Sequence, residues 1–189
     1  MSGSTIDFNN DASGKLPEGW TEGVTGPGEF KWLVEQDATA PSYPNVLKQS
    51  GNGKYPFCVR KDIQIEDGAL EVKFKAVSGK IDQAGGLVWR WKDGDNYYIT
   101  RANALEDNVT IYHTINGKRE KIQVAGVRVE SGKWHTLKVA FKGNQYEVSF
   151  NNVVVLSGID DTIRGAGAVG LWTKADSVTL FDDFTYDRE

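Results

Sequence analysis

The sequence of 189 residues has little of several features on which other protein classes depend. Its single cysteine, Cys58, excludes an internal disulfide, and the two histidines are too far apart for a zinc site of ordinary spacing. No stretch approaches the roughly 18 consecutive apolar residues of a bilayer-crossing helix. The formal net charge is -4, and charges of both signs are interspersed, so no basic stripe neutralises phosphates. We therefore expect neither nucleic acid nor a membrane as a partner.

Aromatic residues and glycine are abundant, whereas helix-favouring runs of Ala, Leu, Glu and Lys are scarce. Short alternating runs separated by Gly, Asn, Asp and Pro predict an all-β, two-sheet antiparallel sandwich. We expect one domain over residues 1–189, with residues 1–4 flexible or a cloning remnant. The expected strands are 4–8, 30–35, 45–49, 57–59, 69–76, 83–91, 97–103, 108–115, 118–124, 134–141, 145–151, 153–156, 168–173 and 177–186.

Short polar turn sequences predict the hairpins. Asn116-Gly117 lies between two alternating runs, and Asn-Gly suits a two-residue hairpin because both residues tolerate positive φ. Lys142-Gly143-Asn144 and Asn151-Asn152 predict the next two hairpins. Proline and glycine interrupt the first 60 residues, so we expect long loops there that form a rim. The last strand is expected to pair near the N-terminal one.

One predicted hairpin concentrates aromatic and cationic side chains. Read with a period of two, its first strand places Arg90 on one face and Trp89 and Trp91 on the other. Beyond the turn, Tyr97 and Arg101 share a face. The C–H faces of sugars stack on aromatic rings, and sugar hydroxyls bind the planar donors of Arg and Asn. The pattern therefore indicates a carbohydrate site.

Longer strings carry a more specific signal. They are Ala84-Gly-Gly-Leu-Val-Trp-Arg90, Asn96-Tyr-Tyr98, Arg101-Ala-Asn-Ala-Leu-Glu-Asp-Asn-Val109, Trp134-His-Thr-Leu137, Gly170-Leu-Trp-Thr-Lys-Ala-Asp-Ser-Val178 and Phe181-Asp-Asp-Phe184. In this order they resemble the 3-keto-disaccharide hydrolase domain family, a bacterial branch of the concanavalin A-like lectin/glucanase and laminin-G-like sandwiches. The resemblance implies a jelly-roll-like sandwich with a carbohydrate-facing concave sheet, and a glycosidase-type hydrolase acting on 3-keto-disaccharide-like or related sugars.

The sequence departs from the β-glucan-cleaving relatives in one respect. Those enzymes carry the acid and the nucleophile as alternating acidic residues on one strand, in a Glu-x-Asp-x-Glu pattern, because retention needs two carboxyl groups about 5 Å apart. No such string occurs here. The acidic pairs Glu106-Asp107 and Asp182-Asp183 are adjacent, and adjacent strand residues point to opposite faces. A glucanase mechanism is therefore disfavoured.

Another acid/base arrangement is available if polar residues of the family strings converge. We take Glu106 or Asp176 as the candidate general base, and Arg101 or Lys174 as the group that stabilises developing negative charge. Such a base and cation would serve to abstract the proton next to the ketone of a 3-keto sugar. The expected substrate-binding residues are Trp89, Arg90, Trp91, Tyr97, Asn103, Asn108 and Trp172. The sequence does not choose between Tyr112 and His113 as a sugar contact.

Two other functions stay open, a non-catalytic carbohydrate-binding module and a laminin-G-like protein-interaction domain. No cofactor is required, although relatives of this fold hold a structural calcium with a last-strand aspartate, and Asp182 or Asp183 with Asp7 matches that position. We expect a carbohydrate partner and a monomer. The compartment is open: the chain is extracytoplasmic with its signal removed, or cytoplasmic.

Overall fold

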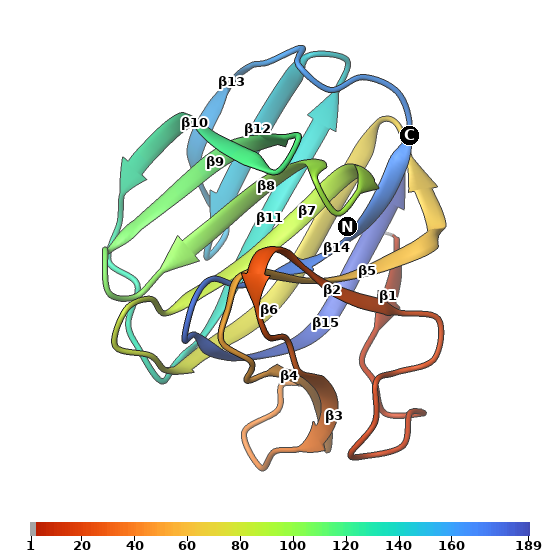
Figure 1. Cartoon of the computed structure of the whole chain (residues 1–189), viewed down its shortest axis with the longest axis vertical. Helices are drawn as coiled ribbons and strands as arrows, with labels where there is room; N and C mark the ends of the chain where they lie inside the picture. Colours follow the sequence, from red (N-terminus) through yellow and green to blue (C-terminus); the bar gives the residue numbers. More distant parts are fainter. Residues whose placement is uncertain (1–2) are drawn as a thin grey trace.

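The computed structural model describes residues 3–189, which form strands and turns (Figure 1). No helix capable of crossing a membrane occurs in these residues. The strands are β1 (Ser4–Ile6), β2 (Thr21–Gly28), β3 (Trp32–Gln36), β4 (Asn45–Gln49), β5 (Gly53–Ile65), β6 (Gly68–Ser78), β7 (Ala84–Asp93), β8 (Asn96–Asn103), β9 (Asn108–Ile115), β10 (Lys118–Gly126), β11 (Trp134–Lys142), β12 (Gln145–Phe150), β13 (Val153–Ile159), β14 (Gly167–Trp172) and β15 (Val178–Arg188).

The strands pair into two antiparallel sheets that pack face to face. The front sheet in Figure 1 has the order β10-β9-β8-β7-β14-β5-β2. The back sheet has the order β13-β12-β11-β6-β15-β4-β3, and β1 pairs with β15. The sequence-based prediction of a two-sheet antiparallel sandwich is therefore confirmed.

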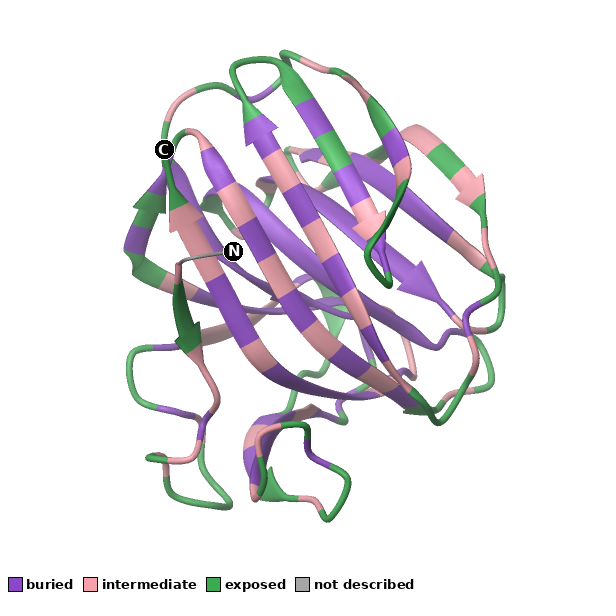
Figure 2. Cartoon of the chain, turned by 180° about the vertical axis from the view of Figure 1, so that it is seen from behind, coloured by how far each residue is buried: buried purple, intermediate pink, exposed green. Residues whose placement is uncertain are grey.

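The back sheet shows the alternation that its sequence predicts. In β6, Leu70, Val72 and Phe74 are buried, whereas the residues between them are partly exposed. Figure 2 shows the same alternation of buried and more exposed residues along neighbouring strands of this sheet. One face therefore packs on the core and the other meets solvent, as antiparallel sheets commonly do.

Stacked aromatic rings fill the core between the sheets. Trp89 of β7 stacks on Tyr98 of β8 and on Phe141 of β11, with ring centroids 5.4 and 5.8 Å apart. At the other end, Trp32 of β3 stacks on Phe181 of β15 at 5.6 Å. The Trp89–Phe141 stack joins the two sheets, whereas Trp32 and Phe181 both belong to the back sheet. Each buried ring contributes apolar area that folding removes from water.

The front sheet buries residues on its outer face as well. This second cluster consists of Tyr55, Phe57, Val59, Ala84, Val88, Trp91, Tyr97, Ile99, Tyr112, Ala168 and Trp172. The sheet is strongly curved, because Arg119 of β10 lies 4.9 Å from the ring of Tyr55 on β5 although four strands separate them in the sheet. The outer face is thus concave, and we call it the concave face.

The predicted hairpins are confirmed. Asn116 and Gly117 have φ values of 51° and 78° and join β9 to β10, as the Asn-Gly pair requires. The turn at Gly143 joins β11 to β12, and Asn151 and Asn152, both with positive φ, join β12 to β13. Gly117 also donates its N–H to the carbonyl of Asp95 at 3.0 Å, so the tips of the two front hairpins meet.

The N-terminal third holds more regular structure than its sequence indicates. β2 contains three glycines and a proline, and β5 continues through Pro56 to residue 65. β2 tolerates such residues because it is an edge strand that pairs only with β5. The predicted pairing of the two ends is confirmed, with Thr5 opposite Thr185. Of the expected flexible residues 1–4, residues 1–2 lie outside the described part, whereas Ser4 begins β1.

Candidate functional site

Arg101 organises one end of the concave face. Its Nη2 lies 2.8 Å from Oε2 of Glu106 and donates to the hydroxyl of Tyr112 at 3.0 Å. Its Nη1 donates to the side-chain oxygen of Asn108. Arg101 is 3% exposed, whereas Glu106 reaches solvent from the β8–β9 turn. We call these four residues, Arg101, Glu106, Asn108 and Tyr112, the arginine cluster.

A second ion pair lies next to the arginine cluster. Lys174, which follows β14, has its Nζ 3.2 Å from Oδ2 of the buried Asp82. The other oxygen of Asp82 accepts a hydrogen bond from the amide of Asn103 at 2.8 Å. The side chains of Asn103 and Arg101 leave β8 on the same face, because they are two residues apart. The Lys174–Asp82 pair and the arginine cluster thus meet through β8.

Asn103 shapes the turn that presents Glu106. It is fully buried, and its side-chain oxygen accepts the N–H of Leu105 at 2.9 Å and that of Glu106 at 3.4 Å. These hydrogen bonds order the turn between β8 and β9. Asn103 therefore positions Glu106 rather than facing a ligand.

Asp176 is engaged by backbone amides. Its carboxylate accepts the N–H groups of Lys80 at 2.7 Å and of Ile81 and Asp82 at 3.1 Å. Partial burial raises the pKa of Asp176, but these hydrogen bonds outweigh it and leave the pKa below its ordinary value. Asp176 thus holds the segment that carries Asp82, and Glu106 is the candidate base that we carry forward.

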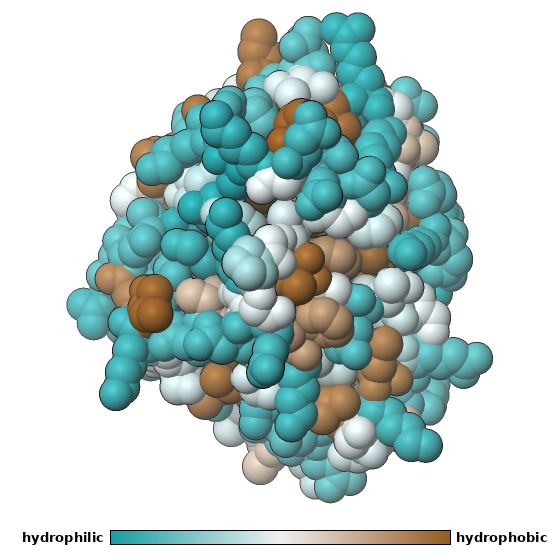
Figure 3. Space-filling model, in the orientation of Figure 1, coloured by the Kyte–Doolittle hydropathy of each residue, from teal (hydrophilic) through white to brown (hydrophobic). Residues whose placement is uncertain are grey.

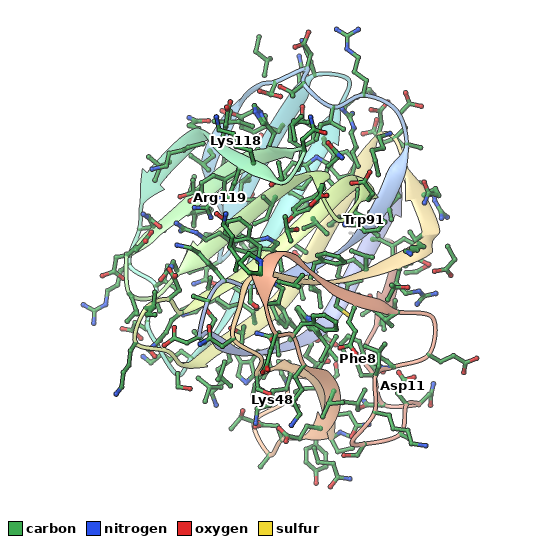
Figure 4. All side chains as sticks on the ribbon, in the orientation of Figure 1. Phe8, Asp11, Lys48, Trp91, Lys118 and Arg119 are labelled. Atoms are coloured by element: carbon green, nitrogen blue, oxygen red, sulfur yellow. The ribbon has the colours of Figure 1, made fainter. Side chains whose placement is uncertain are left out.

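Aromatic rings form the rest of the concave face. Trp172 and Tyr55 stack with centroids 5.4 Å apart. Arg119 lies over them, 3.9 Å from the Tyr112 ring centroid, 4.9 Å from Tyr55 and 5.8 Å from Trp172. Figure 4 marks Arg119 and Trp91 on opposite sides of this view of the face. Figure 3 shows residues of intermediate and hydrophobic character near the middle of the view, with hydrophilic residues above and around them.

Tyr97 and Trp91 extend the aromatic surface toward the hairpin tips. The hydroxyl of Tyr97 lies 2.7 Å from that of Thr25, and burial raises the pKa of Tyr97. Trp91 packs on Phe57 at 5.7 Å, and the ammonium of Lys61 lies 5.5 Å from the Trp91 ring. The two rings belong to the buried cluster beneath the concave face.

Arg90 and Trp89 lie away from the concave face. Arg90 has a φ of 45° where the β7–β8 register shifts, so the period of two breaks there. The prediction that Trp89 and Trp91 share a face is therefore wrong: Trp89 belongs to the core between the sheets and Trp91 to the concave face.

The guanidinium of Arg90 closes one end of the sandwich. It donates to the carbonyls of Glu66 and Ile163 at 3.1 Å and to that of Gly143 at 2.8 Å, and it pairs with Asp67 at 3.3 Å. These partners come from three separate connecting segments. Arg90 therefore ties the loops of the two sheets together.

The three aspartates expected to hold calcium lie near Ser42. Asp182 accepts the Ser42 N–H at 2.8 Å, and its burial, together with the charges of Asp183 and Asp7, raises its pKa to about 7. Asp183 is paired with Lys73 at 3.1 Å. Within residues 3–189 no three acidic, histidine or cysteine side chains form a metal-sized group, so we derive no step through a cation.

A sequence model of the 3-keto-alpha-glucoside-1,2-lyase-like domain matches residues 4–185. The chain belongs to this family. The resemblance found in its sequence strings is thereby confirmed. No curated protein sequence matches the chain significantly.

Solved structures share the fold of this 3-keto-alpha-glucoside-1,2-lyase-like domain. The carbohydrate-binding module CBM66 from Bacillus subtilis matches with a TM-score of 0.72 at 20% identity, over 89% of this chain and 95% of that one. The Bacteroides ovatus mixed linkage glucan PUL GH16, in complex with G4G4G3G product, has a TM-score of 0.68 at 12% identity, over 97% and 99%. A Bacillus subtilis protein of unknown function with a galectin-like fold has 0.63 at 12%, over 90% of both chains.

Sequence reasoning missed three residues of the concave face in this lyase-like domain: Arg119, Asp82 and Tyr55. Arg119 follows the Asn-Gly turn, which sets its register opposite Thr114, two residues beyond Tyr112. The hairpin pattern alone could therefore have predicted that Arg119 lies close to Tyr112. Asp82 contacts Asn103 across the β7–β8 hairpin, but Lys174 approaches it from the segment after β14, and Tyr55 meets Arg119 only because the sheet curves. The sequence contains no local signal for the contact of Lys174 with Asp82 or for that of Arg119 with Tyr55.

Proposed function

We propose that the concave face binds a carbohydrate and that its polar end cleaves the glycosidic bond of a 3-keto glycoside by elimination. One observation carries the proposal: Asn103 links the Glu106 turn, and with it the Arg101–Glu106 pair, to the Lys174–Asp82 pair, and Arg119 spans from Tyr112 to the stacked rings of Trp172 and Tyr55. The family description, which refers to a 3-keto-alpha-glucoside 1,2-lyase, supports this chemistry.

The composition of the face suits a sugar. Aromatic rings stack on the apolar C–H faces of a pyranose, and guanidinium, ammonium and amide groups donate to its hydroxyl and ketone oxygens. The side chains of Arg101 and Asp82 are 4% and 2% exposed, so their charges act in a medium of low dielectric constant, where such hydrogen bonds are strong.

The elimination uses a base and a cation. Glu106 takes the proton from the carbon between the ketone and the anomeric centre, and the C–H electron pair moves onto the ketone oxygen. Arg101 stabilises this enolate by hydrogen bonding. The electron pair then returns, the bond from the anomeric carbon to the leaving oxygen breaks, and the leaving oxygen takes a proton from Lys174. The products are an unsaturated keto sugar and a free alcohol or sugar.

A second candidate is a carbohydrate-binding module without catalysis. Glu106 and Asp82 are both held by cations, at 2.8 and 3.2 Å, which favours a charge-balanced binding surface over a carboxylate free to accept a proton. The fold shared with CBM66 supports the same candidate.

Turnover of a 3-keto-disaccharide tests the proposal. The wild-type protein is incubated with oxidised and unoxidised disaccharides, and the released monosaccharide and the ultraviolet absorbance of the unsaturated ketone are followed. We expect release from the oxidised sugar alone, and a fall of about 100-fold in kcat for Glu106→Gln. Glu147→Gln, an exposed change on β12 of the back sheet, is the matched control.

Other outcomes would select the other functions. Sugar binding without release would leave only the binding module. Unchanged turnover in Glu106→Gln would remove Glu106 from the mechanism. Failure to bind any glycan, with specific capture of a protein partner, would favour the laminin-G-like alternative.

A further inference from the structure

Arg119 is a cation without an anionic partner. Within residues 3–189 it forms no ion pair, although it crosses the concave face of a chain with more acidic than basic residues. Its guanidinium lies over the rings of Tyr112, Tyr55 and Trp172, and its Nη1 is buried without a hydrogen-bond partner. Ring faces attract a cation, but they do not satisfy its N–H groups.

Arg101 is paired with Glu106, and Lys174 with Asp82. Among the described residues, three other cations lie over rings of the concave face and form no ion pair: Lys54 over Tyr55, Lys61 over Trp91, and Arg119. Of these three, Arg119 is the one with a buried N–H group that has no hydrogen-bond partner. Arg101 and Arg119 flank the same ring, at 5.7 and 3.9 Å from the Tyr112 centroid. The Nε of Arg101 is also buried without a partner. Two neighbouring guanidinium groups with unmet donors favour a ligand that brings a negative charge.

We infer that the ligand of the concave face is an acidic sugar, one whose ring carries a carboxylate as in a uronic acid, and that Arg119 binds this carboxylate. The inference rests on the proposed function, because it names the substrate class of the same face. A guanidinium binds a carboxylate through two parallel N–H···O hydrogen bonds, a geometry that neither lysine nor a neutral donor reproduces.

Binding also changes the aromatic surface. In the structure Arg119 covers Tyr112, Tyr55 and Trp172, and Trp172 has no exposed surface. When Arg119 turns to the carboxylate of the ligand, it uncovers these rings for stacking with the sugar. The movement is local, because β10 is an edge strand that pairs only with β9. The fluorescence of the tryptophans therefore reports the event.

A matched pair of ligands tests the inference. One is a disaccharide that contains glucuronic acid, and the other is the same disaccharide with its carboxylate reduced to a hydroxymethyl group. We expect the wild-type protein to bind the acidic sugar about tenfold more tightly or better, the effect of one charge-assisted pair. Raising NaCl from about 50 to 500 mM weakens binding of the acidic sugar only.

Two variants separate Arg119 from general charge. Arg119→Gln removes the preference for the acidic sugar, and Arg119→Lys restores only part of it. Lys118→Gln makes the same change in charge at the neighbouring, solvent-exposed residue of β10 and keeps the preference. Circular dichroism and urea unfolding check that each variant is folded.

The possible results separate this inference from the proposed function. Equal affinity for the two sugars, or a preference that survives in Arg119→Gln, overturns the acidic ligand and leaves carbohydrate binding intact. Absence of binding for neutral, 3-keto and acidic sugars overturns the proposed function and this inference with it.

Discussion

Asp182 makes the stability of the domain depend on pH in an unusual direction. Its side chain is fully buried, and burial, reinforced by Asp183 and Asp7, raises its pKa from 3.8 to about 7. The folded protein therefore holds a proton at this site at a pH at which the unfolded chain has released it. The associated stabilisation is complete below about pH 4 and disappears as the pH rises through about 7.

The size of the effect follows from the shift. A displacement from 3.8 to about 7 corresponds to an upper limit on the order of 4 kcal/mol, and relaxation of the site reduces it to a few kcal/mol. Hydrogen bonds and neighbouring cations lower the pKa of Asp37, Asp62 and Glu130. The stability that these three groups contribute is therefore lost as the pH falls, and this loss occurs below about pH 4. The interval from pH 5 to 8 therefore isolates Asp182 among the carboxyl groups.

Asp182→Asn provides the comparison. The amide resembles the protonated acid but loses one of the two acceptors used by the N–H groups of Ser42 and Asp183, which costs about 1–3 kcal/mol at any pH. In urea unfolding at pH 5, 6, 7 and 8, the wild type is expected to lose stability relative to the variant as pH rises. Parallel curves for the two proteins would refute the assignment. A rise in Tm with calcium at pH 8, abolished by a chelator and by Asp182→Asn, would support the calcium prediction instead.

Two further predictions concern the core and the end of the sandwich. Trp89→Ala removes a ring that stacks on Tyr98 and Phe141 and should lower the free energy of unfolding by about 3–5 kcal/mol in urea; a loss below about 1 kcal/mol would contradict its central place. Arg90→Met leaves three carbonyls and Asp67 without their donor and should cost about 3 kcal/mol, whereas Arg128→Met, at an exposed site, should stay within about 0.5 kcal/mol. Equal effects of the two arginine changes would contradict the structural role of Arg90.

Most of the fold could be predicted from the sequence because its signals are local. Alternation places Leu70, Val72 and Phe74 on one face of β6, and Asn116-Gly117 supplies the φ values that its hairpin needs. β2 escaped prediction because its stability comes from pairing with β5 rather than from its own glycine-rich sequence. Strand propensity describes such an edge poorly, since cross-strand contacts decide whether it forms.

The candidate site divides in the same way. Arg101, Glu106 and Asn108 lie within eight positions of one another, so a single stretch of sequence is enough to group them. Arg119 reaches Tyr112 from the neighbouring strand, as the hairpin register allows. Its contacts with Tyr55 and Trp172 depend on the curvature of the front sheet, and a period of two contains no information about curvature. The sequence groups Arg90 with the site wrongly, because a non-glycine residue with positive φ gives no sequence signal.

The bulge at Arg90 lets one hairpin contribute both to the stability of the sandwich and to the concave face. It leaves Trp89 in the core, turns Trp91 to the concave face and directs the guanidinium of Arg90 to the loops at one end of the sandwich. Arg101 pairs with Gly86, toward the opposite end of β7, so the arginine cluster does not share partners with Arg90. Changes at distant sites without common partners usually add. A variant of Arg90 should therefore lose stability while its folded fraction keeps the affinity of the wild type for sugar, and a combined Arg90 and Arg101 variant should show the sum of the two stability losses.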